Sequence, residues 1–237
     1  MIYVDTNFMS YFAEKVFPEL RWPYILLTHD GDFPMPGKYR YLLKDRKMVA
    51  WFALNLEGKS HSKLHHIPLG PKRMALNSEI ANRVVAKKDQ YEKSHLLYVN
   101  FLIKNYPKER QFVFDLFAKQ LFSFTCLNRD FEGYLEDLAS SKFVLSPRGN
   151  GQDCFRTWEA IHVGAIPIVR SSSLDPLYEG LPVLIIENWE EVTEEFLNAK
   201  YEEMRQKSYN LEKLSLDYWV QKIKAYQREV RQKKFKP

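Results

Sequence analysis

Short apolar runs that end in turn-rich patches constrain the fold of this chain more than any other feature. Such runs are typical of β-strands, and they lie at residues 24–34, 48–55, 63–70, 95–103, 142–146, 165–169 and 181–188. Apolar residues at helical spacing fill segments between or beside them, at residues 7–20, 107–120, 131–141, 153–164 and 190–207. Strands that alternate with helices predict an α/β fold with mainly parallel sheets.

A polar, charged stretch at residues 77–93 separates the runs into two groups and predicts a helix between two halves. We therefore expect two domains, at residues 1–93 and 94–237, each a small Rossmann-like lobe, with the two lobes facing a cleft. The first lobe is short for a nucleotide-binding-like unit. In open α/β sheets, ligands bind where strands end and loops lead into helices. This rule places residues 28–32 and 146–151 on cleft-facing loops.

The net charge and the cysteine content exclude few classes of function. The net charge is +5, and residues 221–237 carry seven Lys or Arg against one Glu. This basic end is interpreted as a solvated helix, or alternatively as a patch for anionic lipid or nucleic acid. Cys126 and Cys154 are the only cysteines and are expected to be free. Because CxxC, HExxH and calcium-loop motifs are absent, no structural metal is expected, and no apolar run has the length of a membrane span.

The segment at residues 146–169, "SPRGNGQDCFRTWEAIHVGAIPIV", holds the densest group of candidate ligand-binding residues. A helix over residues 153–162 would place Asp153, Arg156 and Glu159 on the side opposite to its apolar face, where they would line whatever lies outside. Arg156 falls in the first turn, where free N–H groups and the helix dipole favour an anion. The loop before it supplies further candidates: Arg148, Gly149, Asn150 and Gly151. The segment therefore predicts a diphosphate site.

Glu159 has a different predicted role, because it lies two turns into the helix. A carboxylate there suits vicinal hydroxyl groups, as on a ribose. The alternative is that Asp153, Arg156 and Glu159 form ordinary surface pairs at i,i+3 spacing. The spacing matches neither the GxGxxG nor the Walker pattern.

The same segment resembles the donor-binding segment of exostosin-like glycosyltransferases, which are family-47-type enzymes with a two-lobed GT-B fold. The matching positions are Lys142, Phe143, Leu145, Pro147, Gly149, Arg156, Glu159, Ala160, Gly164, Ile166 and Pro167. The resemblance is most specific over residues 131–170 and looser over most of the remaining chain. It implies an inverting transfer of a sugar from a nucleotide diphosphate sugar, preferably a UDP-sugar, to a hydroxyl group of a glycan acceptor, with no bound metal and no further cofactor.

The resemblance also implies roles for the two lobes. Residues 94–237 would hold the donor, with Glu159 at the ribose and Arg148 and Arg156 at the diphosphate, and residues 1–93 would face the acceptor. Fixed cations and a helix N-terminus would stabilise the charge on the leaving β-phosphate.

An inverting transfer needs a base near the acceptor oxygen, and the first half offers His29, Asp30 and Asp32 at the end of a predicted strand. Asp30 or Asp32 is the candidate base, with His29 as a substitute or orienting partner. The alternative is an ordinary turn in which aspartate caps backbone amides. Lys72 and Arg73 are candidates to reach the donor phosphates across the cleft, or are part of a solvated loop.

Other functions stay open at this point. One is a non-catalytic module that binds a nucleotide sugar or phosphate, and another is a binder of nucleic acid or lipid built on the basic end. Few aromatic residues interleave with the basic ones, so no nucleic-acid partner is expected. His61, His65 and His66 are expected at the surface or in packing, not on a metal. The expected location is cytoplasmic, with peripheral membrane contact through the basic end.

Overall fold

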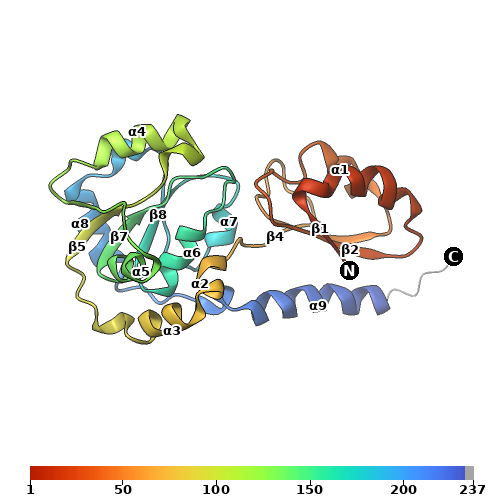
Figure 1. The fold of residues 1–237 in the computed structure, drawn as a ribbon. Coiled ribbons are helices and arrows are strands. Elements are labelled where there is room, and N and C mark those ends of the chain that lie inside the picture. The colour runs from red at the N-terminus through yellow and green to blue at the C-terminus, as the bar shows by residue number, and fades with distance from the viewer. Residues whose placement is uncertain (233–237) are drawn as a thin grey trace. The chain divides into compact units, whose positions relative to one another are not determined.

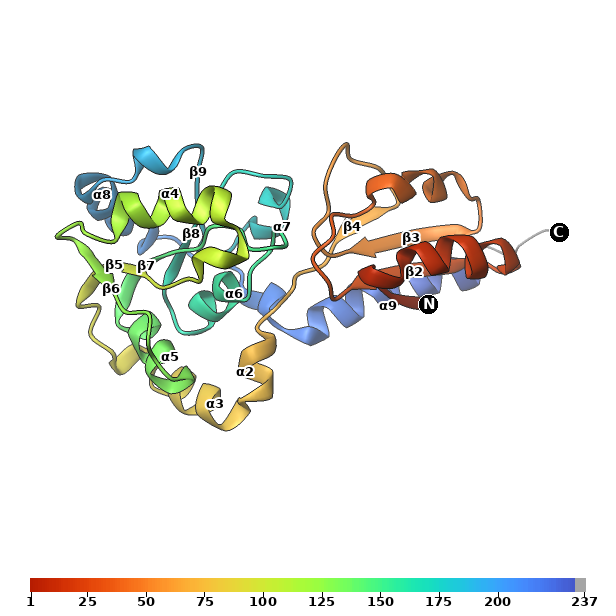
Figure 2. The ribbon, with the colours of Figure 1, turned by 45° about the horizontal axis from the view of Figure 1, so that its top comes forward.

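A computed structural model describes residues 1–232, without the side chains of Lys72 and of residues 229–232. The chain forms two compact units (Figures 1 and 2). Residues 70–211 form one, and residues 1–69 together with the described residues from 212 onward form the other. Both are α/β units with a fully parallel sheet, which confirms the predicted fold class of two Rossmann-like lobes.

The first unit is built on a four-stranded sheet in the order β1-β2-β3-β4. Its strands are β1 (Ile2–Asp5), β2 (Tyr24–His29), β3 (Met48–Ala53) and β4 (Leu64–His66). One face packs against short helical segments that include α1 (Met9–Tyr11) and the 3₁₀ segment Gly37–Lys44. Alternate residues of the central strands point to the other face, as the two-residue period of a strand requires.

Helix α9 (Leu216–Gln232), the last helix among the described residues, covers that other face. Ile223 packs with Ile25, Ala50 and Phe52, and the ring of Tyr226 lies edge-on to Phe52 at 5.6 Å between ring centroids. Figure 2 shows α9 beside β2 and β3. The helix that carries part of the basic end is therefore a structural layer of the first unit.

The second unit has a five-stranded sheet in the order β6-β5-β7-β8-β9. The strands are β5 (His95–Val99), β6 (Ser123–Thr125), β7 (Ser141–Leu145), β8 (Ile166–Arg170) and β9 (Leu184–Ile186). One face packs on α4 (Pro107–Phe117) and α8 (Glu194–Met204). The opposite face packs on α2 (Lys72–Leu76), α3 (Ser78–Ala86), α5 (Phe131–Ala139) and α6 (Phe155–His162). The result is a three-layer sandwich with a core on each side of the sheet (Figure 1).

The compact units differ from the predicted domains at two places. Residues 70–93 join the second unit, because α2 and α3 bury Met74, Ala81 and Val84 against α5 and α6. The described residues from 212 onward join the first unit, because α9 packs on its sheet. The predicted helix between the halves is therefore a layer of one of them.

Candidate functional site

The sheet of the second unit reverses its strand order between β5 and β7. From β5 the chain moves to one side, to β6, and β7 returns on the other side of β5. Such a switch point opens a crevice at the carboxyl ends of the strands, where ligands of doubly wound folds bind. The two loops that border it follow Val99 and Leu145. The second of them is the loop singled out in the sequence.

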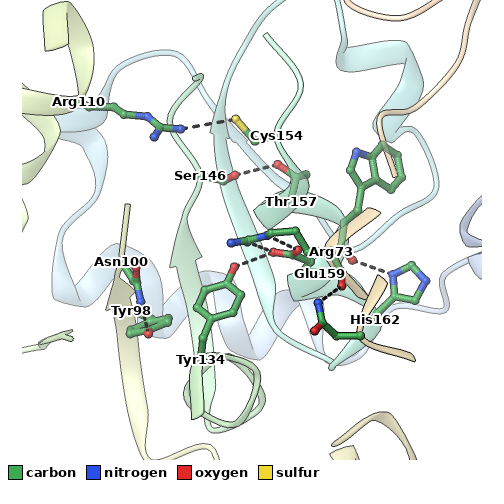
Figure 3. Close-up of polar contacts among 12 residues, drawn as sticks. Arg73, Tyr98, Asn100, Arg110, Tyr134, Ser146, Cys154, Thr157, Glu159 and His162 are labelled. Carbon is green, nitrogen blue, oxygen red and sulfur yellow. Dashed lines mark hydrogen bonds and ion pairs between the residues drawn. The ribbon is translucent and has the colours of Figure 1, made fainter. Parts of the chain in front are cut away.

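Arg110, in the first turns of α4, ties these two loops together. Its Nη1 donates to Leu102 O at 2.9 Å in the first loop. In the second loop, Nε donates to Arg148 O at 2.8 Å and Nη2 to Pro147 O at 3.1 Å. Figure 3 shows the same guanidinium reaching Cys154 Sγ. Arg110 is buried, and no sequence pattern had identified it.

Three arginines lie at this switch point. The guanidinium of Arg148 lies over the ring of Tyr106, and those of Arg110 and Arg156 lie over Phe101 at 5.6 and 5.7 Å. Among the described residues, no ion pair neutralises any of the three. Burial, followed by the positive charge of Arg156, lowers the pKa of Arg110. The site therefore carries an excess of positive charge.

Arg156 shows this excess most clearly. It is the second residue of α6, so the prediction that it falls in the first turn is confirmed. Its Nε is buried and has no hydrogen-bond partner among the described residues. A buried donor without a hydrogen-bond partner costs free energy. An anion beside Arg156 would accept a hydrogen bond from this Nε–H group, and its negative charge would offset the repulsion between the guanidinium groups of Arg156 and Arg110. The arrangement suits an anionic ligand.

The other predicted residues of the loop, Gly149, Asn150 and Gly151, differ in how close they lie to the arginine cluster. A Cβ on Gly149 would lie 3.2 Å from Arg110 Nη2, so the glycine allows the guanidinium to approach the loop backbone. Gly151 is buried, whereas Asn150 is exposed and accepts from Arg148 Nη2 through its carbonyl at 3.1 Å. Of the loop candidates, Arg148 and Gly149 thus lie directly at the arginine cluster.

The predicted outward-facing stripe of α6 is wrong. Asp153 precedes the helix and is buried, accepting from Trp158 Nε1 at 2.9 and 3.0 Å and from its neighbour Cys154 N at 2.8 Å. Glu159 and Ala160 are fully buried as well. The reason is that α2 and α5 pack over the side of α6 that the pattern left to solvent. Asp153 thus has a structural partner in Trp158.

Glu159 is engaged at both oxygens (Figure 3). Arg73 Nε donates to Oε1 at 2.8 Å, and Arg73 Nη2 contacts Oε2 as a short ion pair. Tyr134 Oη donates to Oε2 at 2.9 Å. Arg73 lies in the second unit, the same unit as Glu159, whereas the predicted domains placed it in the first. Its contact with the donor phosphates stays a prediction. The neighbouring side chain of Lys72 lies outside the described residues.

A small polar pocket adjoins the arginine cluster at the ends of β7 and β8. Arg148, Arg170, Ser146 and Thr157 are among its lining residues, and Ser146 Oγ lies 2.8 Å from Thr157 Oγ1. Arg170 ends β8 and is exposed. The sequence analysis did not select Arg170, Ser146 or Thr157. Their position at strand ends was the available signal.

In the first unit, the predicted turn follows β2. Asp30 and Gly31 both have positive φ, of 54° and 74°, and Asp30 O accepts from Thr6 Oγ1 at 2.6 Å. The Asp30 carboxylate accepts from the phenol of Tyr3, and burial together with this hydrogen bond raises the pKa of Tyr3 to about 12. His29 Nε2 donates to Pro68 O at 3.0 Å.

Two of the three base candidates therefore have partners. Asp32 is exposed. The assignment of a catalytic base to this turn therefore stays a prediction.

The remaining expectations concern metals, cysteines and the basic end. Among residues 1–232 no group of three or more His, Cys, Asp and Glu side chains is placed to hold a metal ion. His65 packs as predicted, with its ring 5.0 Å from Phe52 and 4.6 Å from Tyr226. Cys126 and Cys154 are free, as predicted. The part of the basic end after residue 232 lies outside the described residues, and no helix in the described part is long and apolar enough to cross a membrane.

Comparison with known proteins gives one family match. The family described as RXYLT1 C-terminal domain matches residues 91–235, which is more than half of the chain. This family is related to xylosyltransferases of the exostosin type, so the resemblance noted in the sequence is confirmed at the level of a glycosyltransferase-like family. No curated protein matches the chain. The match spans most of the second unit and also α9.

Proposed function

Because the chain belongs to the RXYLT1 C-terminal domain family, we propose that it is an inverting glycosyltransferase that moves a sugar from a nucleotide diphosphate sugar to a hydroxyl group of a glycan acceptor. The observation that carries this proposal is the cluster of Arg110, Arg148 and Arg156 at the switch point of the second sheet. It combines three guanidinium groups that form no ion pair among the described residues, a buried N–H group without a partner, and the start of a helix.

The arginine cluster suits the chemistry of the leaving group. As the bond between the sugar and the β-phosphate breaks, negative charge grows on the departing diphosphate. Fixed guanidinium groups and the first N–H groups of α6 would stabilise this charge without having to reorganise. Arg156 would contact the diphosphate directly, while Arg110 would act by holding the two loops in place. UDP is the preferred nucleotide on the strength of the family resemblance, and metal-independence is part of the same proposal.

The acceptor side of the proposal rests on the turn after β2. A base there would take the proton of the acceptor hydroxyl as its oxygen attacks the anomeric carbon. Asp30 has a fixed position, since Tyr3 donates to its carboxylate and Thr6 to its carbonyl. Asp32 is exposed and lies two residues further along. Asp30 is the preferred base and Asp32 the alternative.

Nucleotide binding tests the donor half of the proposal. UDP in the presence of EDTA is expected to raise the melting temperature of the wild type, since a ligand that binds only the folded state stabilises it. Arg156→Met should weaken UDP binding by about 10- to 100-fold, because a hydrogen bond to a charged group contributes about 1.5–3 kcal/mol. Arg205→Met is the matched control, since Arg205 is an exposed arginine of the same unit that pairs with Glu202.

Turnover tests the catalytic half. The assay follows release of UDP from a panel of UDP-sugars, with glycan acceptors and without them, for the wild type, Asp30→Asn and Asp32→Asn. Loss of UDP release in Asp30→Asn with unchanged UDP affinity supports the base assignment. If UDP binds but no UDP-sugar of the panel is turned over, the result would instead support a non-catalytic module that binds a nucleotide sugar. Absence of UDP binding at millimolar concentration would refute the donor site itself.

A further inference from the structure

The contact between Arg73 and Glu159 is the least expected feature of the proposed donor site. Glu159 is the residue proposed for the ribose, yet its carboxylate is 0% exposed and both of its oxygens already accept hydrogen bonds. Three accepted hydrogen bonds and complete burial together give a ribose no access to this carboxylate. The proposed role of Glu159 therefore requires one of its present donors to leave.

The two donors differ in how firmly they are held. Tyr134 is buried in the core of the second unit and packs with Leu135 and Leu138 of its own helix, so its phenol is fixed. Arg73 has a side chain that is 43% exposed, against 0% for that of Glu159. Its guanidinium lies over the rings of Tyr134 and Phe131, at 5.0 and 5.8 Å, and no other carboxylate in the described part of the chain pairs with it. Arg73 is thus the donor that is able to leave toward solvent.

Helix α2 does not depend on Arg73 for its position. Met74, the next residue, is buried in the cluster that also contains Ala81 and Val84 of α3. The backbone carbonyl of Arg73 accepts from Asn77 Nδ2 at 2.8 Å, which fixes the main chain independently of the guanidinium. The side chain can therefore swing away while the helix stays docked.

The guanidinium and a ribose present a similar pair of hydrogen-bond donors to Glu159, although only the guanidinium is charged. Arginine offers two parallel N–H donors to a carboxylate, and the vicinal 2′- and 3′-hydroxyl groups of a ribose offer two O–H donors side by side. Either pair satisfies both oxygens, and both pairs cannot do so at once. The exchange keeps the carboxylate hydrogen-bonded but removes its cationic partner, so it has a cost that nucleotide binding must exceed.

We propose that Arg73 is a displaceable internal ligand, which occupies Glu159 in the empty site and is replaced there by the ribose of the bound nucleotide. The inference rests on the proposed function of the second unit as a nucleotide site. It makes Arg73 a residue that sets affinity and selects for a ribose, since a 2′-deoxyribose supplies only one of the two hydroxyl donors. Arg73 acts by competition and is not a catalytic residue.

The decisive experiment is isothermal titration of UDP and of 2′-deoxy-UDP into the full chain, as wild type and as Arg73→Met. Removal of an internal competitor raises the fraction of binding-competent sites, so UDP is expected to bind Arg73→Met about 3- to 10-fold more tightly than the wild type. The gain for 2′-deoxy-UDP should be smaller, because a deoxyribose with one hydroxyl donor does not have to displace Arg73 in order to bind. Arg83→Met is the matched control, because Arg83 makes an equally bidentate but exposed ion pair with Glu132, between α3 and α5. It should leave both affinities unchanged.

A second measurement does not depend on the stability of the variant. The Arg73 Nε–H resonance of the wild type, identified by its disappearance in Arg73→Lys, is expected to lose its protection from solvent exchange when UDP is added. Retention of that protection in the UDP complex would overturn the inference, as would equal or weaker UDP binding by Arg73→Met. Absence of UDP binding by both wild type and Arg73→Met is a different failure, since it refutes the nucleotide site and the inference together.

Discussion

Gly31 fixes the turn that carries the candidate base, and replacing it by alanine should destabilise the first unit in a predictable way. The backbone φ of Gly31 is +74°, a conformation that costs an alanine about 1–2 kcal/mol. A Cβ at this position would also lie 2.2 Å from Thr6 Oγ1 and 3.0 Å from Asn7 Nδ2. The substitution therefore adds a clash to a backbone strain.

The cost of the backbone strain and the cost of the clash can be separated by comparing Gly31→Ala with a second glycine variant. Gly58 has a φ of +86° with nothing within 4 Å of a built Cβ, so Gly58→Ala carries the strain without the clash. After the gain of about 0.4–1 kcal/mol from a stiffer unfolded chain, it should cost about 1 kcal/mol. In Gly31→Ala, Thr6 must also move, and its hydroxyl then loses the hydrogen bond to the Asp30 carbonyl, worth about 1 kcal/mol. With the strain of repacking buried Thr6, the total is expected to reach about 3 kcal/mol.

Native-state hydrogen exchange is the appropriate assay, because a chain of two units need not unfold in one step. The free energies of opening are read from the amides of β1 and β2, for the wild type, Gly31→Ala and Gly58→Ala. Equal losses in the two variants would refute the reasoning, because they would show that the contact with Thr6 adds nothing. A Thr6→Ala substitution in the Gly31→Ala background should restore part of the loss.

Arg110→Met removes three guanidinium–carbonyl hydrogen bonds, but it also removes the cost of burying a charged group. The free energy of unfolding of the second unit, measured by urea denaturation, should therefore fall by about 2–4 kcal/mol. An unchanged urea midpoint would contradict this expectation. Ile223→Ala should cost about 2–4 kcal/mol in amide protection of β2 and β3, whereas exposed Ala225→Ser should cost little. Burial, followed by a neighbouring lysine, lowers the pKa of His65 from 6.5 to about 4, and burial lowers that of His66 as well. The unfolded chain therefore binds more protons, so stability should fall as the pH decreases from about 6.5 to about 4, and His65→Phe should flatten that slope.

The apolar runs of the sequence located most of the strands, because buried parallel strands are continuously hydrophobic. Two strands were not predicted. The first, β1, covers four residues at the start of the chain, and its short apolar run at residues 1–4 was overlooked; β6 covers three half-buried residues at a sheet edge and has no continuous apolar run. Helix periodicity located α4, α5, α6 and α8.

The candidate site was predictable only in part. The loop after β7 and the place of Arg156 in the first turn follow from local sequence, since glycines and a helix start are local features. The stripe of Asp153 and Glu159 was misread, because periodicity divides a helix into faces without saying what packs on each. Arg110 was missed for a similar reason. Its segment looks like a solvated helix start, and only the strand order brings that start beside the loop at residues 146–154.

The place of α9 has a consequence for how the chain is made. The second unit is one uninterrupted stretch, whereas the first is completed only by α9, which is synthesised after the whole of the second unit. Until then, the face formed by Ile25, Ala50 and Phe52 has no helix over it, although its strands were synthesised first. We therefore expect the usual order, in which the N-terminal domain folds first during synthesis, to be reversed here. For the same reason, a fragment cut before residue 212 would carry a bare apolar sheet, while a fragment of residues 70–211 would keep its own layers intact.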